Sequence, residues 1–117
     1  RQPAWSVNGL AAEALPELLD TVDLPGWSLA LAGLRVQLSE VLCRHGFVPE
    51  PSDANFVLVG KAGDLRSRLA PHGVAVRDCS SFGLEGRARI AVPGPDDLAR
   101  LDAALAAAFP EGGDLGC

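Results

Sequence analysis

The segment that most constrains the fold of this chain is residues 74–92, VAVRDCSSFGLEGRARIAV. Its two ends are short runs of apolar and β-branched residues, which suit strands. Between them, Ser80, Ser81, Gly83 and Gly86 supply the residue types that turns require. The segment therefore predicts a β-hairpin.

Two arginines, Arg77 and Arg89, lie at the ends of these two runs. A hairpin brings them close in space, and each guanidinium is a planar fork that pairs bidentately with a carboxylate or a phosphate. The pattern predicts a site for a small molecule that carries both groups. The alternative is that both residues are solvated arginines of an edge strand.

Apolar periodicity predicts the remaining elements. Asn8 or Ser6 can cap a first helix that is interrupted or kinked near Pro16, and 23–26 forms a break before the second helix. The predicted helices are 8–19, 28–45, 62–71 and 95–109, and the predicted strands are 55–59, 74–77 and 87–92. This order predicts an α+β fold, a small mixed or antiparallel sheet covered by helices. We expect one domain over 1–117, with a flexible, glycine-rich tail at 110–117.

Charge and composition argue against several classes of function. A net charge of -5 and a pI near 4.8 disfavour nucleic-acid binding, which uses a basic patch. The most apolar region, 27–34, is too short to span a membrane and is followed by Arg35. Cys43, Cys79 and Cys117 form no CxxC motif and no spacing with a histidine that suggests a metal site, so we predict no metal site and a cytoplasmic protein with reduced thiols.

Both histidines precede a glycine at a predicted helix end: His45 before Gly46, and His72 before Gly73. Glycine is typical of the position after a helix, and a histidine in the last turn interacts favourably with the helix dipole. We therefore predict structural roles for both histidines rather than catalytic ones.

Four motifs, in this order, resemble the C-terminal small domain of class I/II aminotransferases, which are PLP-dependent enzymes of fold type I. The likeness covers almost the whole chain. The likeness is greatest to the histidinol-phosphate aminotransferase branch and to threonine-phosphate decarboxylase of cobalamin biosynthesis. The segment RDCSSFGL at 77–84 resembles the decarboxylase more than the aminotransferase. The motifs are QPAWSVN at 2–8, PSDANFVLV at 51–59, GVAVRDCSSF at 73–82 and RIAV at 89–92.

The resemblance implies roles for individual residues. Arg89 matches the arginine that holds the α-carboxylate of the substrate, and Arg77 matches the position that reaches a distal phosphate. The side-chain amide of Asn55 is expected to hydrogen-bond the backbone where the strand meets the loop, and this role is favoured over direct contact with the substrate. Trp5 and Asn8 are expected to pack at the hinge between the large and small domains.

The resemblance also shows what this chain lacks. Lys61 is the single lysine, outside any likeness to the PLP-binding lysine motif, and there is no tyrosine to support the cofactor ring. The cofactor, its lysine and the aspartate that pairs with its pyridine nitrogen are expected in a preceding large domain. The chain begins at Arg1 and has no methionine, so we expect an internal piece that is inactive alone, from an enzyme that dimerises largely through the large domain.

The predicted function is the substrate-binding small domain of a PLP-dependent enzyme that acts on a phosphorylated amino acid. Aminotransfer and decarboxylation both stay open at this point. The alternative from another class is a non-catalytic α+β module whose two arginines capture an anionic small-molecule effector.

Overall fold

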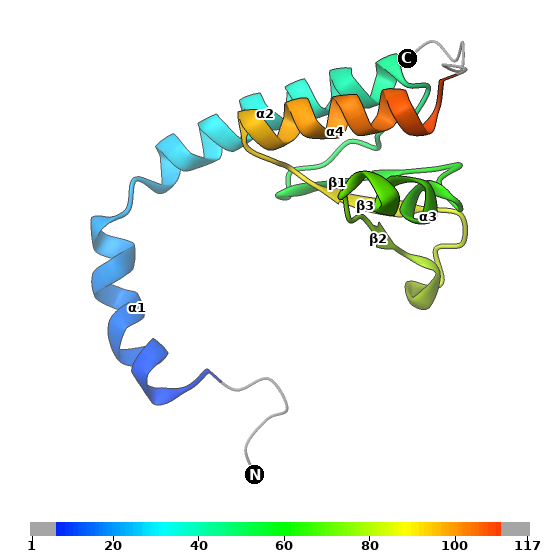
Figure 1. The fold of residues 1–117 in the computed structure, drawn as a ribbon. Helices are drawn as coiled ribbons and strands as arrows, with labels where there is room; N and C mark the ends of the chain where they lie inside the picture. Colours follow the sequence, from blue (N-terminus) through cyan, green and yellow to red (C-terminus); the bar gives the residue numbers. More distant parts are fainter. Residues whose placement is uncertain (1–6, 111–117) are drawn as a thin grey trace.

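The computed structural model describes residues 7–110, and its elements follow the predicted order (Figure 1). The expectations for Trp5, Ser6 and Cys117, and for nearly all of the predicted tail, lie outside these residues. None of the helices described is long and apolar enough to cross a bilayer. The elements are α1 (Gly9–Thr21), α2 (Leu24–Arg44), β1 (Phe56–Val59), α3 (Leu65–Leu69), the 3-10 turn η1 (Ala70–His72), β2 (Arg77–Asp78), the 3-10 turn η2 (Ser80–Phe82), β3 (Ala88–Ala91) and α4 (Pro95–Ala108).

The three strands form one antiparallel sheet in the order β1-β3-β2, which confirms the predicted α+β class. β3 is central and pairs with both neighbours. Within residues 7–110, β2 pairs only with β3, so its other side is a free edge of the described sheet.

One face of the sheet is buried because side chains alternate along each strand. Val57, Val59, Ala88 and Ile90 point into the core, whereas Arg89 and Ala91, which alternate with the core residues along β3, are exposed. α2 and α4 lie side by side over this buried face (Figure 1). Their fully or nearly fully buried leucines complete the core: Leu38, Leu42, Leu101 and Leu105.

The prediction that α2 begins at Ser28 is wrong, since the helix begins at Leu24. The Asp23 side chain accepts a 2.9 Å hydrogen bond from the Gly26 backbone N–H and so caps the first turn. Pro25 fits in that turn, where its missing N–H has no partner to lose. The break between the helices is confined to residues 22–23, and α1 continues through Pro16 to Thr21.

β2 is also shorter than the predicted strand 74–77. Gly73 adopts a left-handed φ of 72° after η1, and the Val74 N–H bonds back to the Leu69 carbonyl at 3.3 Å. The chain leaving η1 is therefore held at the helix end and pairs with β3 only from Arg77 onward.

The cysteines differ in state. Cys79 is buried with a free thiol. Cys43 on α2 is disulfide-bonded, so the prediction of reduced thiols throughout the chain is wrong for this residue.

Candidate functional site

The predicted hairpin places Arg77 close to Arg89. In the structure the two residues are register partners across the β2–β3 pair. Arg89 is also the register partner of Leu58 on β1. Directly opposed residues of an antiparallel pair point to the same face. Both guanidiniums therefore extend from the sheet face opposite the core.

An aromatic ring lies under each guanidinium. The Arg77 guanidinium carbon is 5.2 Å from the centre of the Phe82 ring, and that of Arg89 is 4.9 Å from the centre of the Phe56 ring. Such cation–π contacts contribute about 0.5–1 kcal/mol at exposed sites. They orient each fork and leave its N–H donors available.

Most of the described arginines form an ion pair with a carboxylate or donate a hydrogen bond to a backbone carbonyl, but three do neither. Arg66, Arg77 and Arg89 form no ion pair and no side-chain hydrogen bond with any residue of 7–110. This separates them from the solvated, paired arginines elsewhere on the surface. The partnered pairs are Arg44–Asp102, Arg68–Asp64, Arg87–Glu50, Arg100–Asp97 and Arg35 with the Ala54 carbonyl.

A pocket of about 730 Å³ opens at the free edge of β2. Arg66 enters it from α3 and Arg77 from β2, together with two serine hydroxyls. Arg89 does not line this pocket. The pocket is formed by Arg66, Ala75, Val76, Arg77, Asp78, Ser80 and Ser81.

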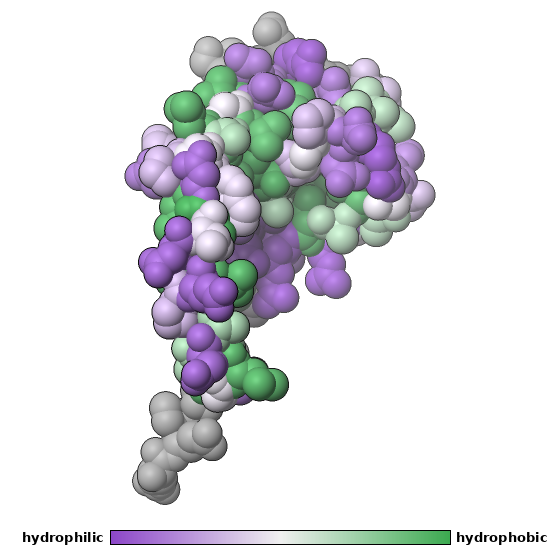
Figure 2. All heavy atoms as spheres, turned by 90° about the vertical axis from the view of Figure 1, so that its left-hand side faces the viewer, coloured by the Kyte–Doolittle hydropathy of each residue, from purple (hydrophilic) through white to green (hydrophobic). Residues whose placement is uncertain are grey.

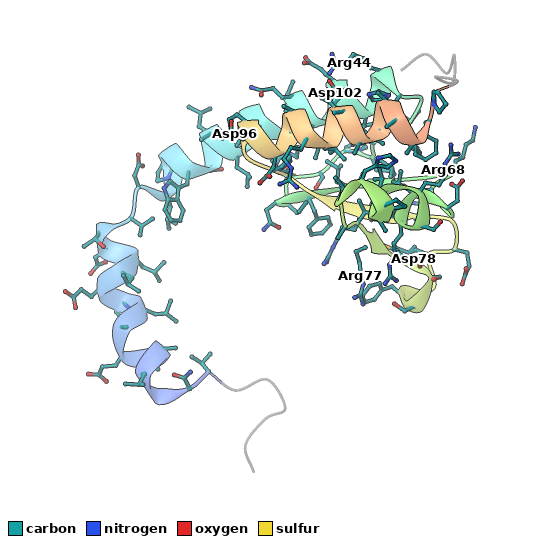
Figure 3. The ribbon with its side chains drawn as sticks, in the orientation of Figure 1. Arg44, Arg68, Arg77, Asp78, Asp96 and Asp102 are labelled. Atoms are coloured by element: carbon teal, nitrogen blue, oxygen red, sulfur yellow. The ribbon has the colours of Figure 1, made fainter. Side chains whose placement is uncertain are left out.

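The Asp78 carboxylate is fixed at the rim of the pocket by Ser80. The Ser80 hydroxyl donates to it, and the Ser80 backbone N–H donates at 2.8 Å. These two bonds, the hydroxyl first, lower the pKa of Asp78 below its ordinary value, and the charges of Arg66 and Arg77 lower it further. Figure 3 shows Arg77 and Asp78 together at the β2 end of the domain.

Sequence reasoning missed Arg66. It lies in the run LRSRL with Arg68, and nothing in that run distinguishes the two arginines. The structure does: the Arg68 guanidinium lies 3.7 Å from the centre of the Phe109 ring and bonds the Ala108 carbonyl, whereas Arg66 reaches the pocket.

The hydrogen-bonding role predicted for the Asn55 amide belongs to Ser52. The Ser52 hydroxyl donates to the Phe56 carbonyl at 2.7 Å and accepts from the Ala54 N–H at 3.1 Å. Asn55 contributes its backbone carbonyl, which accepts from the Val92 N–H at 2.9 Å. The exposed Asn55 side chain bonds none of the described residues. Asn8, expected at a hinge, is the N-cap of α1, where its side chain accepts from the Ala11 N–H at 2.8 Å.

The two histidines occupy helix ends, as predicted. His45 is the C-cap of α2, and its Nε2 lies 2.7 Å from an oxygen of Asp102 on α4. Arg44 reaches the other oxygen of the same carboxylate at 3.0 Å, so the three residues join α2 to α4. His72 ends η1, before Gly73.

Lys61 is exposed on the turn between β1 and α3, with a left-handed φ of 54°. No aromatic ring contact to it is present in this part of the chain. Lys61 is thus a surface residue of this turn.

Two known proteins that are similar in sequence to this chain are both named histidinol-phosphate aminotransferase. A histidinol-phosphate aminotransferase of Symbiobacterium thermophilum is 39% identical over 112 residues, which cover 92% of this chain and 31% of that protein. Histidinol-phosphate aminotransferase 2 of Ralstonia nicotianae is 36% identical over 118 residues, which cover 95% of this chain and 31% of that protein. The chain thus spans about a third of the length of these relatives. No family model matches it.

The fold also has a solved counterpart. A crystal structure from Burkholderia pseudomallei, of a protein described as a candidate aminotransferase, superposes with a TM-score of 0.61 and 35% identity. The match covers 66% of this chain and 24% of that one. Together the comparisons identify an aminotransferase-like small domain.

Proposed function

We propose that this aminotransferase-like small domain binds the substrate of a PLP-dependent enzyme that acts on a phosphorylated amino acid. The observation that carries the proposal is the opposed pair Arg77 and Arg89, two guanidiniums on one exposed sheet face without an acidic partner among residues 7–110. Like charges placed directly opposite destabilise a sheet, so an arrangement of this kind is typical of a site that receives anions.

Each arginine has a distinct role in the proposal. Arg89, on the central strand, holds the α-carboxylate and thereby orients the reacting end of the substrate. Arg77, at the sheet edge, holds the phosphate, a remote group whose binding energy positions the reacting centre. Both roles use a permanently charged fork, for which lysine is a poor replacement.

The cofactor belongs to another part of the enzyme in this proposal. The relatives are about three times as long as the region they share with this chain, which supports a larger partner domain. The names of the relatives favour aminotransfer. A threonine-phosphate decarboxylase-like reaction, as in cobalamin biosynthesis, uses both anchors because O-phosphothreonine carries a carboxylate and a phosphate.

The surface against which we expect the partner domain to pack is the arm formed by α1 and the start of α2. No residue of α1 is buried, and large apolar side chains are exposed along the arm (Figure 2). The most exposed are Leu10 at 85%, Leu29 at 77% and Trp27 at 66%. A patch of this kind is typical of an interface.

The test is product analysis with the enzyme that contains this domain, using O-phosphothreonine and its unphosphorylated analogue. Release of carbon dioxide identifies decarboxylation, and transfer of the amino group to a 2-oxo acid identifies aminotransfer. Turnover that does not depend on the phosphate contradicts the assignment of a phosphorylated substrate. Binding of phosphorylated ligands without any turnover supports the anionic-effector module instead.

A further inference from the structure

We infer that Arg66 is a second phosphate-binding residue, which together with Arg77 and the Ser81 hydroxyl forms a phosphate subsite at the free edge of β2. The inference rests on the proposed function and adds a specificity-determining residue to it.

The pocket geometry brings the two arginines to one place from different elements. Arg66 comes from α3, Arg77 comes from β2, and both line the same 730 Å³ pocket. Asp78 lines the pocket as well, and the charges of both arginines contribute to the lowered pKa of its carboxylate. Arg66 and Arg77 therefore line one pocket, although they are eleven residues apart in the sequence.

Neither arginine is occupied by another group. Arg66 has no ion pair and no side-chain hydrogen bond to any residue in the described range, and the Arg77 fork contacts only the Phe82 ring. The Ser81 hydroxyl likewise bonds none of these residues, in contrast to the Ser80 hydroxyl, which donates to Asp78. The pocket thus presents two forks and one hydroxyl as available donors.

The charge of the pocket favours an anion. Arg66 and Arg77 contribute +2 and Asp78 contributes −1, which leaves +1 among the lining residues. Asp78 is held by Ser80 at the rim, so its negative charge is partly satisfied by two hydrogen bonds.

The number of donors selects phosphate over carboxylate. A phosphate monoester offers three terminal oxygens, enough for two guanidinium forks and a hydroxyl, whereas a carboxylate offers two. Arg89, outside the pocket, is left for the carboxylate. A substrate would accordingly lie with its phosphate at the edge of the sheet and its carboxylate over the central strand.

The test is an NMR titration of this chain, labelled with ¹⁵N, with inorganic phosphate at constant ionic strength. We expect the amides of Arg66, Arg77 and Ser81 to shift together, and acetate at the same ionic strength to leave them unchanged. Arg66→Gln should weaken phosphate binding about ten-fold, the lower end of what the loss of one charge-assisted hydrogen bond produces.

The matched control is Arg100→Gln, which removes the same charge from an exposed arginine of α4. Arg100 is paired with Asp97 and does not line this pocket, so phosphate affinity should stay within about two-fold. Arg66→Lys provides a second variant that keeps the charge and loses the fork, and it should retain part of the affinity. The amide spectrum of each variant reports whether the fold is intact.

Equal weakening by Arg66→Gln and Arg100→Gln would mean that phosphate responds only to overall charge, and the subsite would not exist. An unchanged affinity in Arg66→Gln, alongside a loss in Arg77→Gln, would remove Arg66 and leave the proposed function standing. Conversely, a phosphate subsite that depends on Arg66, in an enzyme whose turnover is indifferent to phosphorylation, would support the subsite and contradict the proposed function.

Discussion

Arg77 and Arg89 face each other as register partners across the β2–β3 pair, and each guanidinium rests on a phenylalanine ring rather than on a carboxylate. Like charges at directly opposed positions cost up to about 1 kcal/mol. The two cation–π contacts offset part of this cost. The remaining electrostatic conflict is relieved when an anion binds between or beside the forks, and this links the sheet to its proposed function.

The first prediction concerns Arg89. In the enzyme that contains this domain, Arg89→Ala should lower kcat/KM by roughly two to three orders of magnitude, equal to about 3–4 kcal/mol of transition-state stabilisation. The unfolding free energy should change by less than about 1 kcal/mol, since the lost repulsion and the lost cation–π contact oppose each other. Steady-state kinetics and denaturant unfolding check both values, with Arg100→Ala as the exposed control. Activity within a few-fold of the parent contradicts the carboxylate role.

The second prediction separates Arg77 from Arg89. Arg77→Ala should reduce kcat/KM strongly for the phosphorylated amino acid and leave the rate on its unphosphorylated analogue almost unchanged, because only the phosphorylated substrate uses this anchor. A charge-assisted bond contributes about 1.5–3 kcal/mol, so the preference for the phosphorylated substrate should fall about ten-fold to a hundred-fold. Equal losses on both substrates would instead assign Arg77 a structural role.

The third prediction concerns the cofactor. After incubation with PLP and dialysis, this chain alone should retain no cofactor absorbance and show no turnover, because its single lysine, Lys61, lies on an exposed turn. The enzyme containing the domain should retain the cofactor under the same treatment. Stable absorbance that disappears in Lys61→Ala would contradict the placement of the cofactor outside this chain.

The fourth prediction concerns Asp78. Ser80→Ala removes the bond that contributes most to its lowered pKa, so the pKa should rise toward the ordinary value of 3.8. A lowered pKa in the folded state means that the carboxylate stabilises the turn above pH 3.8 and that this contribution is lost as the pH falls through the folded value. A ¹³C carboxyl titration of both proteins measures the pKa. The same pKa in both would show that the hydroxyl bond is absent in solution.

The fifth prediction tests the core. Leu105→Ala should destabilise the domain by about 2–5 kcal/mol, since this side chain is fully buried on α4. Leu29→Ala makes the same chemical change at a side chain that is 77% exposed, and it should alter the stability of this chain by less than about 0.5 kcal/mol. Urea unfolding of both variants gives the difference. Similar losses of stability in the two variants would mean that the arm formed by α1 and the start of α2 packs against the rest of this chain in solution.

Local sequence alone was enough to predict the order of helices and strands, the hairpin and the approach of Arg77 to Arg89. These features depend on apolar periodicity, on turn residues and on a strand register, all of which act over a few residues. The Asn8 cap and the left-handed Gly73 follow from the same short-range chemistry.

Tertiary structure decided which of several equivalent residues takes each role. Arg66 and Arg68 are alike in sequence, but packing of α3 against α4 places Arg68 on Phe109 and leaves Arg66 at the β2 pocket. Such choices depend on contacts between residues far apart in the chain, and those contacts exist only once the helices have packed on the sheet.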